Sequence, residues 1–307
     1  MRPEIKRILI FCAFAFLPAI GVCLWLVLSG VMYVAPLAGK LAFAACMFFP
    51  AIASILTRRI TREGFSGMLL RPNFKKNVGR YALAAFLPMG LIVLGAALYY
   101  LLYPAMFDST MPTIASALQG TGAQPYAYVG SQAIVALLFG WLVNFIPAFG
   151  EELGWRGYLL PQLTKCMSTG KAILVSGAIW GVWHTPMIVL GHNYGTGYPG
   201  YPYLGILAMT VFCMLFGAFL SYLTLKVRSV LPAAMAHGAL NAGAALGMVF
   251  VANSVFNPVM GPALTGVIPM VALLPFAVWF FLRARKLTLL PPVVDTPAAE
   301  PAEEAHA

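Results

Sequence analysis

The sequence predicts an all-α, polytopic membrane protein with about eight transmembrane helices and with both termini in the cytoplasm. Of its 307 residues, 61% are hydrophobic, and the mean hydropathy of +0.85 is far above what the surface of a soluble domain tolerates. Apolar stretches long enough to cross the hydrocarbon core of a bilayer recur along the chain. In addition, the basic residues are concentrated in every second loop.

Eight apolar stretches account for the expected helices. The first follows a basic start, MRPEIKR, as in a signal peptide, but it is too long for one and no small-residue cleavage site closes it. We therefore expect a retained first helix. The stretches, in order, are 8–29, 39–57, 81–103, 129–150, 172–190, 204–225, 233–251 and 263–282.

The distribution of basic residues predicts the orientation. The net charge of +10 would suggest nucleic acid as a partner if the protein were soluble. With a cytoplasmic N-terminus, however, all 19 Lys and Arg residues except Lys40 fall on the cytoplasmic side. This asymmetry follows the positive-inside rule and makes membrane lipids, not nucleic acid, the expected partner of the basic loops. We expect the loop with seven of these cations, RRITREGFSGMLLRPNFKKNVGR, to be solvated.

The cysteines and the C-terminal tail indicate one domain without a disulfide frame. No CxxC pair occurs, so the cysteines are expected to behave as small apolar residues. They are Cys12, Cys23, Cys46, Cys166 and Cys213. Residues 287–307 are rich in Ala, Pro and Glu, which predicts a disordered tail after a transmembrane domain at 1–286.

Polar residues inside the apolar stretches are the candidates for function, because charged groups are costly in a bilayer. At 1.5 Å per residue, Glu151 lies up to about 21 Å from Lys165 along its helix. His184, His237 and Asn241 lie about 14–20 Å from the nearest cation on theirs. Polar side chains from three helices are therefore expected to meet at a similar depth.

The spacing within NFIPAFGEELGWRGYLLPQL predicts different roles for Glu151 and Glu152. Glu152 and Arg156 are four residues apart, so they share a helix face and can neutralise one another. Glu151 points about 100° away and has no such cation, which suits a general base.

The histidines extend this constellation. His237 and Asn241 are also four residues apart, among small neighbours that allow another helix or a peptide to approach closely. His184 follows two tryptophans. Two His and one Glu form the ligand set of one class of catalytic zinc site, here His184, His237 and Glu151. The same side chains suit metal-free activation of water with stabilisation of an oxyanion. Both routes lead to hydrolysis of a carbonyl compound.

Simpler interpretations exist for each feature alone. An intramembrane His or Asn often only bonds a neighbouring helix. EELGWR can form a salt bridge at the water interface, and the interfacial Tyr and Trp residues are typical of an aromatic belt. The combination of acid, amide and imidazole groups in so apolar a chain favours a shared site.

Three motifs in order resemble those of one family. They are Glu151-Glu152-x-x-x-Arg156, Trp180-x-x-x-His184 and His237-x-x-x-Asn241. The chain is similar in these motifs, in its basic loop and in its helix number to the CAAX-protease and bacteriocin-processing (CPBP, or Abi) intramembrane proteases. The second motif often opens with Phe, and we expect Trp180 to change only the shape of the pocket.

The resemblance implies an intramembrane endopeptidase, of which eukaryotic relatives remove the last three residues of prenylated CAAX proteins. It implies that Glu151 activates water with His184, and that His237 and Asn241 bind the intermediate or help to hold a metal such as Zn²⁺. Glu152 and Arg156 would form a supporting ion pair. The family is described both as metalloproteases and as glutamate-dependent peptidases.

The leading prediction is therefore hydrolysis of a peptide bond in a peptide or membrane-protein substrate, near the cytoplasmic leaflet of a prokaryotic cell membrane. The alternative is a non-catalytic immunity or scaffold protein that retains the polar core. A transporter has less support, because the sequence has no repeated halves and no paired broken helices.

Overall fold

The computed structural model describes residues 2–31, 36–252 and 256–289, so most of the tail predicted at 287–307 lies outside it. The described residues are mainly helical, and Phe107 and Val251 form an isolated β-bridge. The α-helices are α1 (Pro3–Ser29), α3 (Pro36–Cys46), α4 (Phe49–Ile60), α5 (Val78–Leu102), α6 (Pro112–Ala117), α7 (Pro125–Val143), α8 (Phe145–Gly154), α9 (Leu160–Cys166), α10 (Thr169–Trp183), α11 (Thr185–Val189), α12 (Tyr203–Val227), α13 (Leu231–Gly243) and α14 (Val267–Ala284). Short helical turns are η1 (Pro104–Met106), the π-helix η2 (Trp155–Leu159) and η3 (Leu246–Met248).

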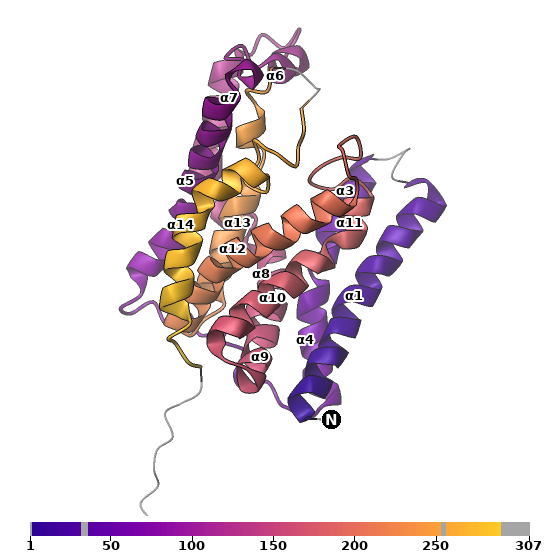
Figure 1. The fold of residues 1–307 in the computed structure, drawn as a ribbon, viewed down its shortest axis with the longest axis vertical. Helices are drawn as coiled ribbons and strands as arrows, with labels where there is room; N and C mark the ends of the chain where they lie inside the picture. Colours follow the sequence, from indigo (N-terminus) through magenta and orange to yellow (C-terminus); the bar gives the residue numbers. More distant parts are fainter. Residues whose placement is uncertain (1, 32–35, 253–255, 290–307) are drawn as a thin grey trace, which may run out of the picture.

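Seven described helical segments are long and apolar enough to cross a membrane, which agrees with an integral membrane protein. They match seven of the eight predicted stretches and span Pro3–Ser29, Leu37–Ile60, Val78–Leu102, Pro125–Val143, Thr169–Val189, Tyr203–Val227 and Val267–Ala284. The other stretch, 233–251, falls on α13, which has only 13 residues and is continued toward the far end of the molecule through η3 (Figure 1).

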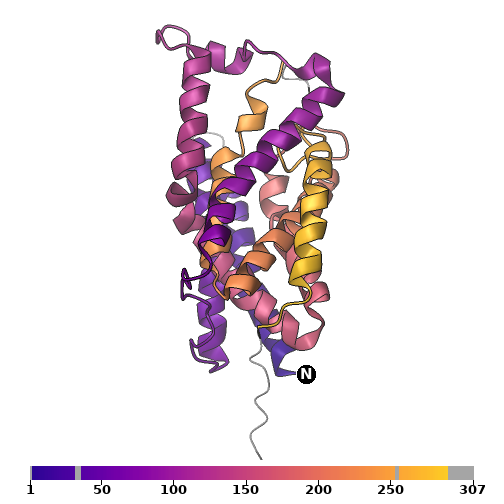
Figure 2. The ribbon, with the colours of Figure 1, turned by 90° about the vertical axis from the view of Figure 1, so that its left-hand side faces the viewer.

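The two ends of the helical bundle differ in what they carry. The N-terminus and the end of α14 lie at one end, together with α9 (Figures 1 and 2). We call this the basic end, because the loops with the predicted cytoplasmic cations lie there. Helices α3, α6 and α11 lie toward the opposite end (Figure 1). The start of α1 and the end of α14 on one side are what the N-in, C-in topology requires.

Prolines interrupt the helices that carry the polar motifs. Pro161 has no N–H, so the carbonyl of Gly157 loses its usual helical donor. The turn before Pro161 is the π-helix η2, and the guanidinium of Arg58 donates to the Gly157 carbonyl at 3.4 Å. Pro147 and Pro186 lie just after the breaks between α7 and α8 and between α10 and α11. The breaks therefore arise where proline removes a donor within the bundle.

Two glycines bring α10 against α12 at backbone distance. A Cβ atom on Gly181 would lie 2.4 Å from Thr210 Cα, and one on Gly177 would lie 2.7 Å from Met214 Cα. Their spacing of four residues puts them on one helix face. This is the close approach by small residues that holds transmembrane helices together, and it sets the position of Trp180 and His184.

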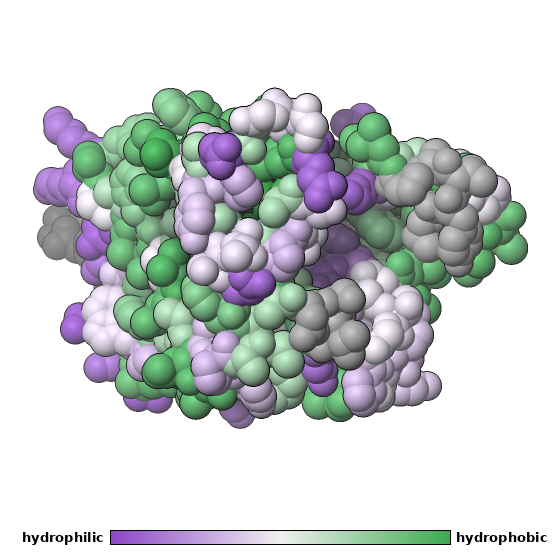
Figure 3. Space-filling view, turned by 90° about the horizontal axis from the view of Figure 1, so that it is seen from above, coloured by the Kyte–Doolittle hydropathy of each residue, from purple (hydrophilic) through white to green (hydrophobic). Residues whose placement is uncertain are grey.

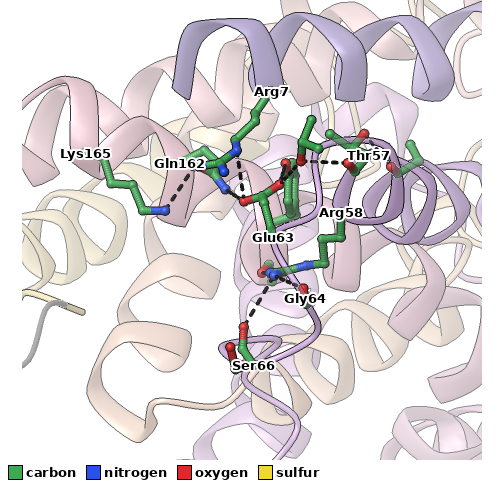
Figure 4. A network of polar contacts seen from close by, with 12 residues as sticks. Arg7, Thr57, Arg58, Glu63, Gly64, Ser66, Gln162 and Lys165 are labelled. Carbon is green, nitrogen blue, oxygen red and sulfur yellow. Dashed lines mark hydrogen bonds and ion pairs between the residues drawn. The ribbon is translucent and has the colours of Figure 1, made fainter. Parts of the chain in front are cut away.

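A polar network ties three segments together at the basic end (Figure 4). Glu63 accepts hydrogen bonds from Tyr158 and Gln162, both at 2.5 Å, and from Thr61 at 2.8 Å. Arg7 of α1 forms an ion pair with it at 3.5 Å. The network joins α1, the loop after α4 and the segment that follows Glu151.

The basic loop is therefore not solvated throughout, contrary to the sequence prediction. Arg58 is only 6% exposed, and its guanidinium lies over the ring of Tyr158 at 4.9 Å. It also donates to the carbonyls of Gly64 and Ser66. The carbonyl acceptors of the loop and of η2, together with the ring of Tyr158, hold this cation inward.

This network predicts a stability that depends on pH. Burial alone would raise the pKa of Glu63, but hydrogen bonds from Tyr158, Thr61 and Gln162 and the charge of Arg7 outweigh it, so the pKa lies below its ordinary 4.5. A lowered folded-state pKa stabilises the protein above the unfolded pKa, and this contribution is lost as the pH falls through the folded value. Thermal unfolding in detergent should show wild type more stable than Glu63→Gln at pH 7, with a difference that shrinks below about pH 4.5. A difference that does not change with pH would contradict this.

Candidate active site

A cavity of about 500 Å³ contains the predicted polar side chains, a volume typical of ligand sites. Glu151 from α8, His184 at the junction of α10 and α11, and His237 and Asn241 from α13 all line it. The convergence expected from counting along three helices is therefore present. Glu152 and Arg156 are not among the lining residues; both side chains lie completely buried behind it.

Glu151 is 2% exposed and is held by two tryptophans. The indole N–H groups of Trp180 and Trp155 donate to the same oxygen, Oε2, at 2.7 and 3.2 Å. The other oxygen, Oε1, is left for water or a substrate. The expectation that Trp180 affects only pocket shape was wrong, because its indole also donates to the carboxylate, which a Phe ring cannot do.

One oxygen of Glu152 bonds both Arg156 of the first motif and His237 of the third. Its Oε1 accepts from Arg156 Nη1 at 3.0 Å and from His237 Nδ1 at 2.9 Å. The predicted ion pair is present, and His237 is an additional partner that sequence reasoning missed. Since Nδ1 of His237 bonds Glu152, Nε2 is the ring nitrogen left for the cavity.

Arg156 links the first motif to the second. Its guanidinium carbon lies 4.3 Å from the centre of the Trp180 ring, a cation–π contact in a dry environment. A Cβ atom on Gly217 would lie 2.8 Å from Arg156 Nη2, so a glycine of α12 makes room for the guanidinium. Arg156 thereby supports both Glu152 and the indole that donates to Glu151.

His184 is oriented by the break in its helix. Its backbone N–H donates to the carbonyl of Gly181, which leaves the carbonyl of Trp180 without its helical donor. The imidazole Nδ1 lies 2.9 Å from that carbonyl oxygen and supplies the missing hydrogen bond. Because Nδ1 must carry the proton to donate, a neutral His184 presents an unprotonated Nε2. Trp183 packs edge-on against the ring, with centroids 5.1 Å apart.

The predicted zinc ligands do not form a three-ligand site. Among the residues that the structure describes, no three His, Cys, Asp or Glu side chains are grouped so that they could hold a metal. Glu151, His184 and His237 line the same cavity, where Oε2 of Glu151 and Nδ1 of each histidine have protein partners. Binding of Zn²⁺ by these three side chains stays a prediction from the sequence.

Comparisons with known proteins cover this region. Residues 132–243, which contain all three motifs, match the family model "Type II CAAX prenyl endopeptidase Rce1-like". The chain is also similar to CAAX prenyl protease 2 of Methanococcus maripaludis, with 36% identity over 64 residues. That match covers 18% of this chain and 24% of the relative, so the chain is aligned with only about a quarter of that protein.

The motifs, the membrane-spanning helices and these matches agree with one another. They support the family resemblance seen in the sequence: residues 132–243, which carry all three motifs, are similar to Rce1-like CAAX prenyl endopeptidases.

Proposed function

We propose that the protein is an intramembrane endopeptidase in which Glu151 and His184 activate the water that hydrolyses a peptide bond. The observation that carries this proposal is a buried carboxylate, fixed at Oε2 by two indoles, in one cavity with two imidazoles and an amide. The match to the Rce1-like family over the same residues supports it.

The geometry suggests a role for each group in a metal-free reaction. Glu151 Oε1 takes a proton from water, and Nε2 of His184 accepts the second O–H and orients the nucleophile. The oxygen of this water adds to the peptide carbonyl carbon. The amide of Asn241, and Nε2–H of His237 when that ring is protonated, donate to the oxyanion that forms. As the C–N bond breaks, Glu151 returns its proton to the leaving nitrogen.

Glu152, Arg156 and Trp180 are positioning residues in this proposal. Glu152 fixes the ring of His237 through Nδ1, as a carboxylate partner commonly orients a working histidine. Arg156 neutralises Glu152 and supports Trp180. None of the three needs to touch the substrate.

Trp180→Phe, which restores the aromatic residue common in the family, tests the role of the indole. The variant loses the N–H that bonds Glu151 but keeps the ring beside Arg156. A hydrogen bond to a charged group contributes about 1.5–3 kcal/mol, so we expect kcat to fall about 10- to 100-fold. Trp279→Phe is the matched control, since Trp279 lies in α14 and does not line the cavity. If both variants keep wild-type kcat, the indole does not position Glu151.

A complementation experiment separates the peptidase from the non-catalytic alternative. A deletion strain is complemented with wild type, Glu151→Ala or a Glu151→Gln, His184→Ala double variant, and new peptide termini are compared by proteomics. The peptidase proposal predicts termini that appear only with wild type, and these identify the substrate. An immunity or scaffold protein predicts that the double variant restores the wild-type phenotype.

A further inference from the structure

The cavity is closed toward the basic end of the molecule. Its lining includes Glu151, Trp180, Cys213 and His237, and none of the described residues from α4, α9 or α14. Toward the basic end from these residues, Trp155, Glu152 and Arg156 are each 0% exposed. A substrate therefore does not reach Glu151 from the side where the cationic loops lie.

The cavity continues toward the opposite end. Its other polar lining residues, Lys40 of α3, His192 and Asn193 after α11, and Thr265 before α14, belong to segments at that end (Figure 1). The space-filling view onto this face shows a hollow with hydrophilic residues in its depth (Figure 3).

The distribution of charge indicates on which side of the membrane the cavity opens. Cationic loops remain in the cytoplasm, and those of this chain gather at the basic end. The open face is then extracytoplasmic. The sequence alone predicts cleavage near the cytoplasmic leaflet, whereas the position of the cavity opening points to the opposite leaflet.

Lys40 stands out on the open face. It is the one Lys or Arg residue among the described residues that line the cavity, and its side chain is exposed. Met47 lies seven residues further along the chain, and a Cβ atom on Gly150, the neighbour of Glu151, would lie 2.8 Å from its carbonyl oxygen. At 1.5 Å per residue Lys40 is about 10 Å above the level of the carboxylate. An extended peptide covers that distance in a few residues.

Resting on the proposed endopeptidase function, we infer that the cavity receives its peptide from the extracytoplasmic face and that Lys40 pairs with a carboxylate of that peptide. The carboxylate lies a few residues from the bond that is cut. It belongs either to the C-terminus or to an acidic side chain, and both offer the same anionic partner to an ammonium group.

Thiol labelling tests the side of access without depending on catalysis. Thr265→Cys places a thiol at the cavity opening, and Lys171→Cys places one on the exposed surface of the basic end. In spheroplasts, a membrane-impermeant maleimide should modify Thr265→Cys and leave Lys171→Cys unmodified until the membrane is permeabilised. Each variant is compared with wild type, whose five native cysteines give the background. The reverse pattern would overturn the inference and leave the peptidase proposal standing.

Peptide variants test the role of Lys40. The purified protein is given a cleavable peptide from a library in three forms: with a free C-terminus, with an amidated C-terminus, and amidated with one Asp between the cut and the end. We expect at least one carboxylate form to be cleaved with a KM about 10-fold below that of the neutral amide, in line with one charge-assisted bond. Lys40→Gln should remove the preference and Lys40→Arg should retain it.

The outcomes of this second experiment are distinct. Equal KM values for all three forms with wild type would overturn the role of Lys40. If wild type cleaves none of the library peptides, the endopeptidase proposal fails, whereas the labelling result still reports the face on which the cavity opens.

Discussion

Glu151→Gln is expected to lower kcat for peptide hydrolysis about 10²- to 10⁴-fold, the usual contribution of a general base. The amide keeps the shape of the side chain, and its oxygen can still accept from the indole of Trp180, but it cannot take a proton from water. Because the change acts on the chemical step, KM should change little. Steady-state kinetics of purified wild type and variant on one library peptide provide the measurement.

Glu4→Gln is the matched control for this change. Glu4 lies in the first turn of α1, far along the chain from the cavity and not among its lining residues. It should leave kcat unchanged. Glu151→Gln and Glu4→Gln with the same kcat would exclude Glu151 as the base, provided that both melt at the wild-type temperature.

Glu152→Leu is expected to destabilise the protein by about 3–5 kcal/mol, because it leaves Arg156 buried without its counter-charge. Arg156 and Glu152 are both completely buried, and His237 loses its Nδ1 partner in the same step. The lost stability should appear as a lower melting temperature in detergent or nanodiscs.

The double variant Glu152→Leu, Arg156→Met distinguishes a broken ion pair from lost packing. Apolar replacement of both partners of a buried pair is often neutral or stabilising, so the double variant should melt well above Glu152→Leu alone. Its activity should remain low, since His237 is no longer oriented. If both variants melt at the same low temperature, the buried charge of Arg156 is not the cause of the instability.

The sequence predicted the framework of the site because its signals are local. Apolar runs of membrane-crossing length mark the helices, and spacing of four residues puts Glu152 beside Arg156 and His237 beside Asn241. Few polar residues interrupt these runs, so those that do were visible as candidates. The meeting of Glu151, His184 and His237 in one cavity follows from similar depths on three helices.

The partners of these residues depend on tertiary packing and could not be obtained in the same way. The bond from Trp180 to Glu151 crosses from α10 to α8, and the bond from His237 to Glu152 joins α13 to α8. The second bond needs a close helix contact that a glycine permits, because a Cβ atom on Gly238 of α13 would lie 3.1 Å from the carbonyl carbon of Asn144, just before α8. Trp155, however, was within reach of sequence reasoning, since it lies four residues after Glu151 on the same helix face.

The direction of the cavity is also a property of the whole fold. Helix counting gave a depth for Glu151 but not the side from which it is reached. The side of access depends on residues far apart in the sequence. Buried Trp155 and Arg156 close the cavity toward the basic end, and Lys40 and Thr265 lie at its opening. The helix break beside Pro186 orients His184, because the carbonyl of Trp180 loses its helical donor there and bonds the imidazole Nδ1 instead.

Hydrolysis of peptide bonds by Glu151 and His184 can be measured with purified protein and a peptide library. Wild type, Glu151→Ala and His184→Ala are incubated in parallel, and new termini are identified by mass spectrometry. We expect new termini with wild type and none with either variant. Unchanged cleavage by both variants would show that neither residue is part of the reaction.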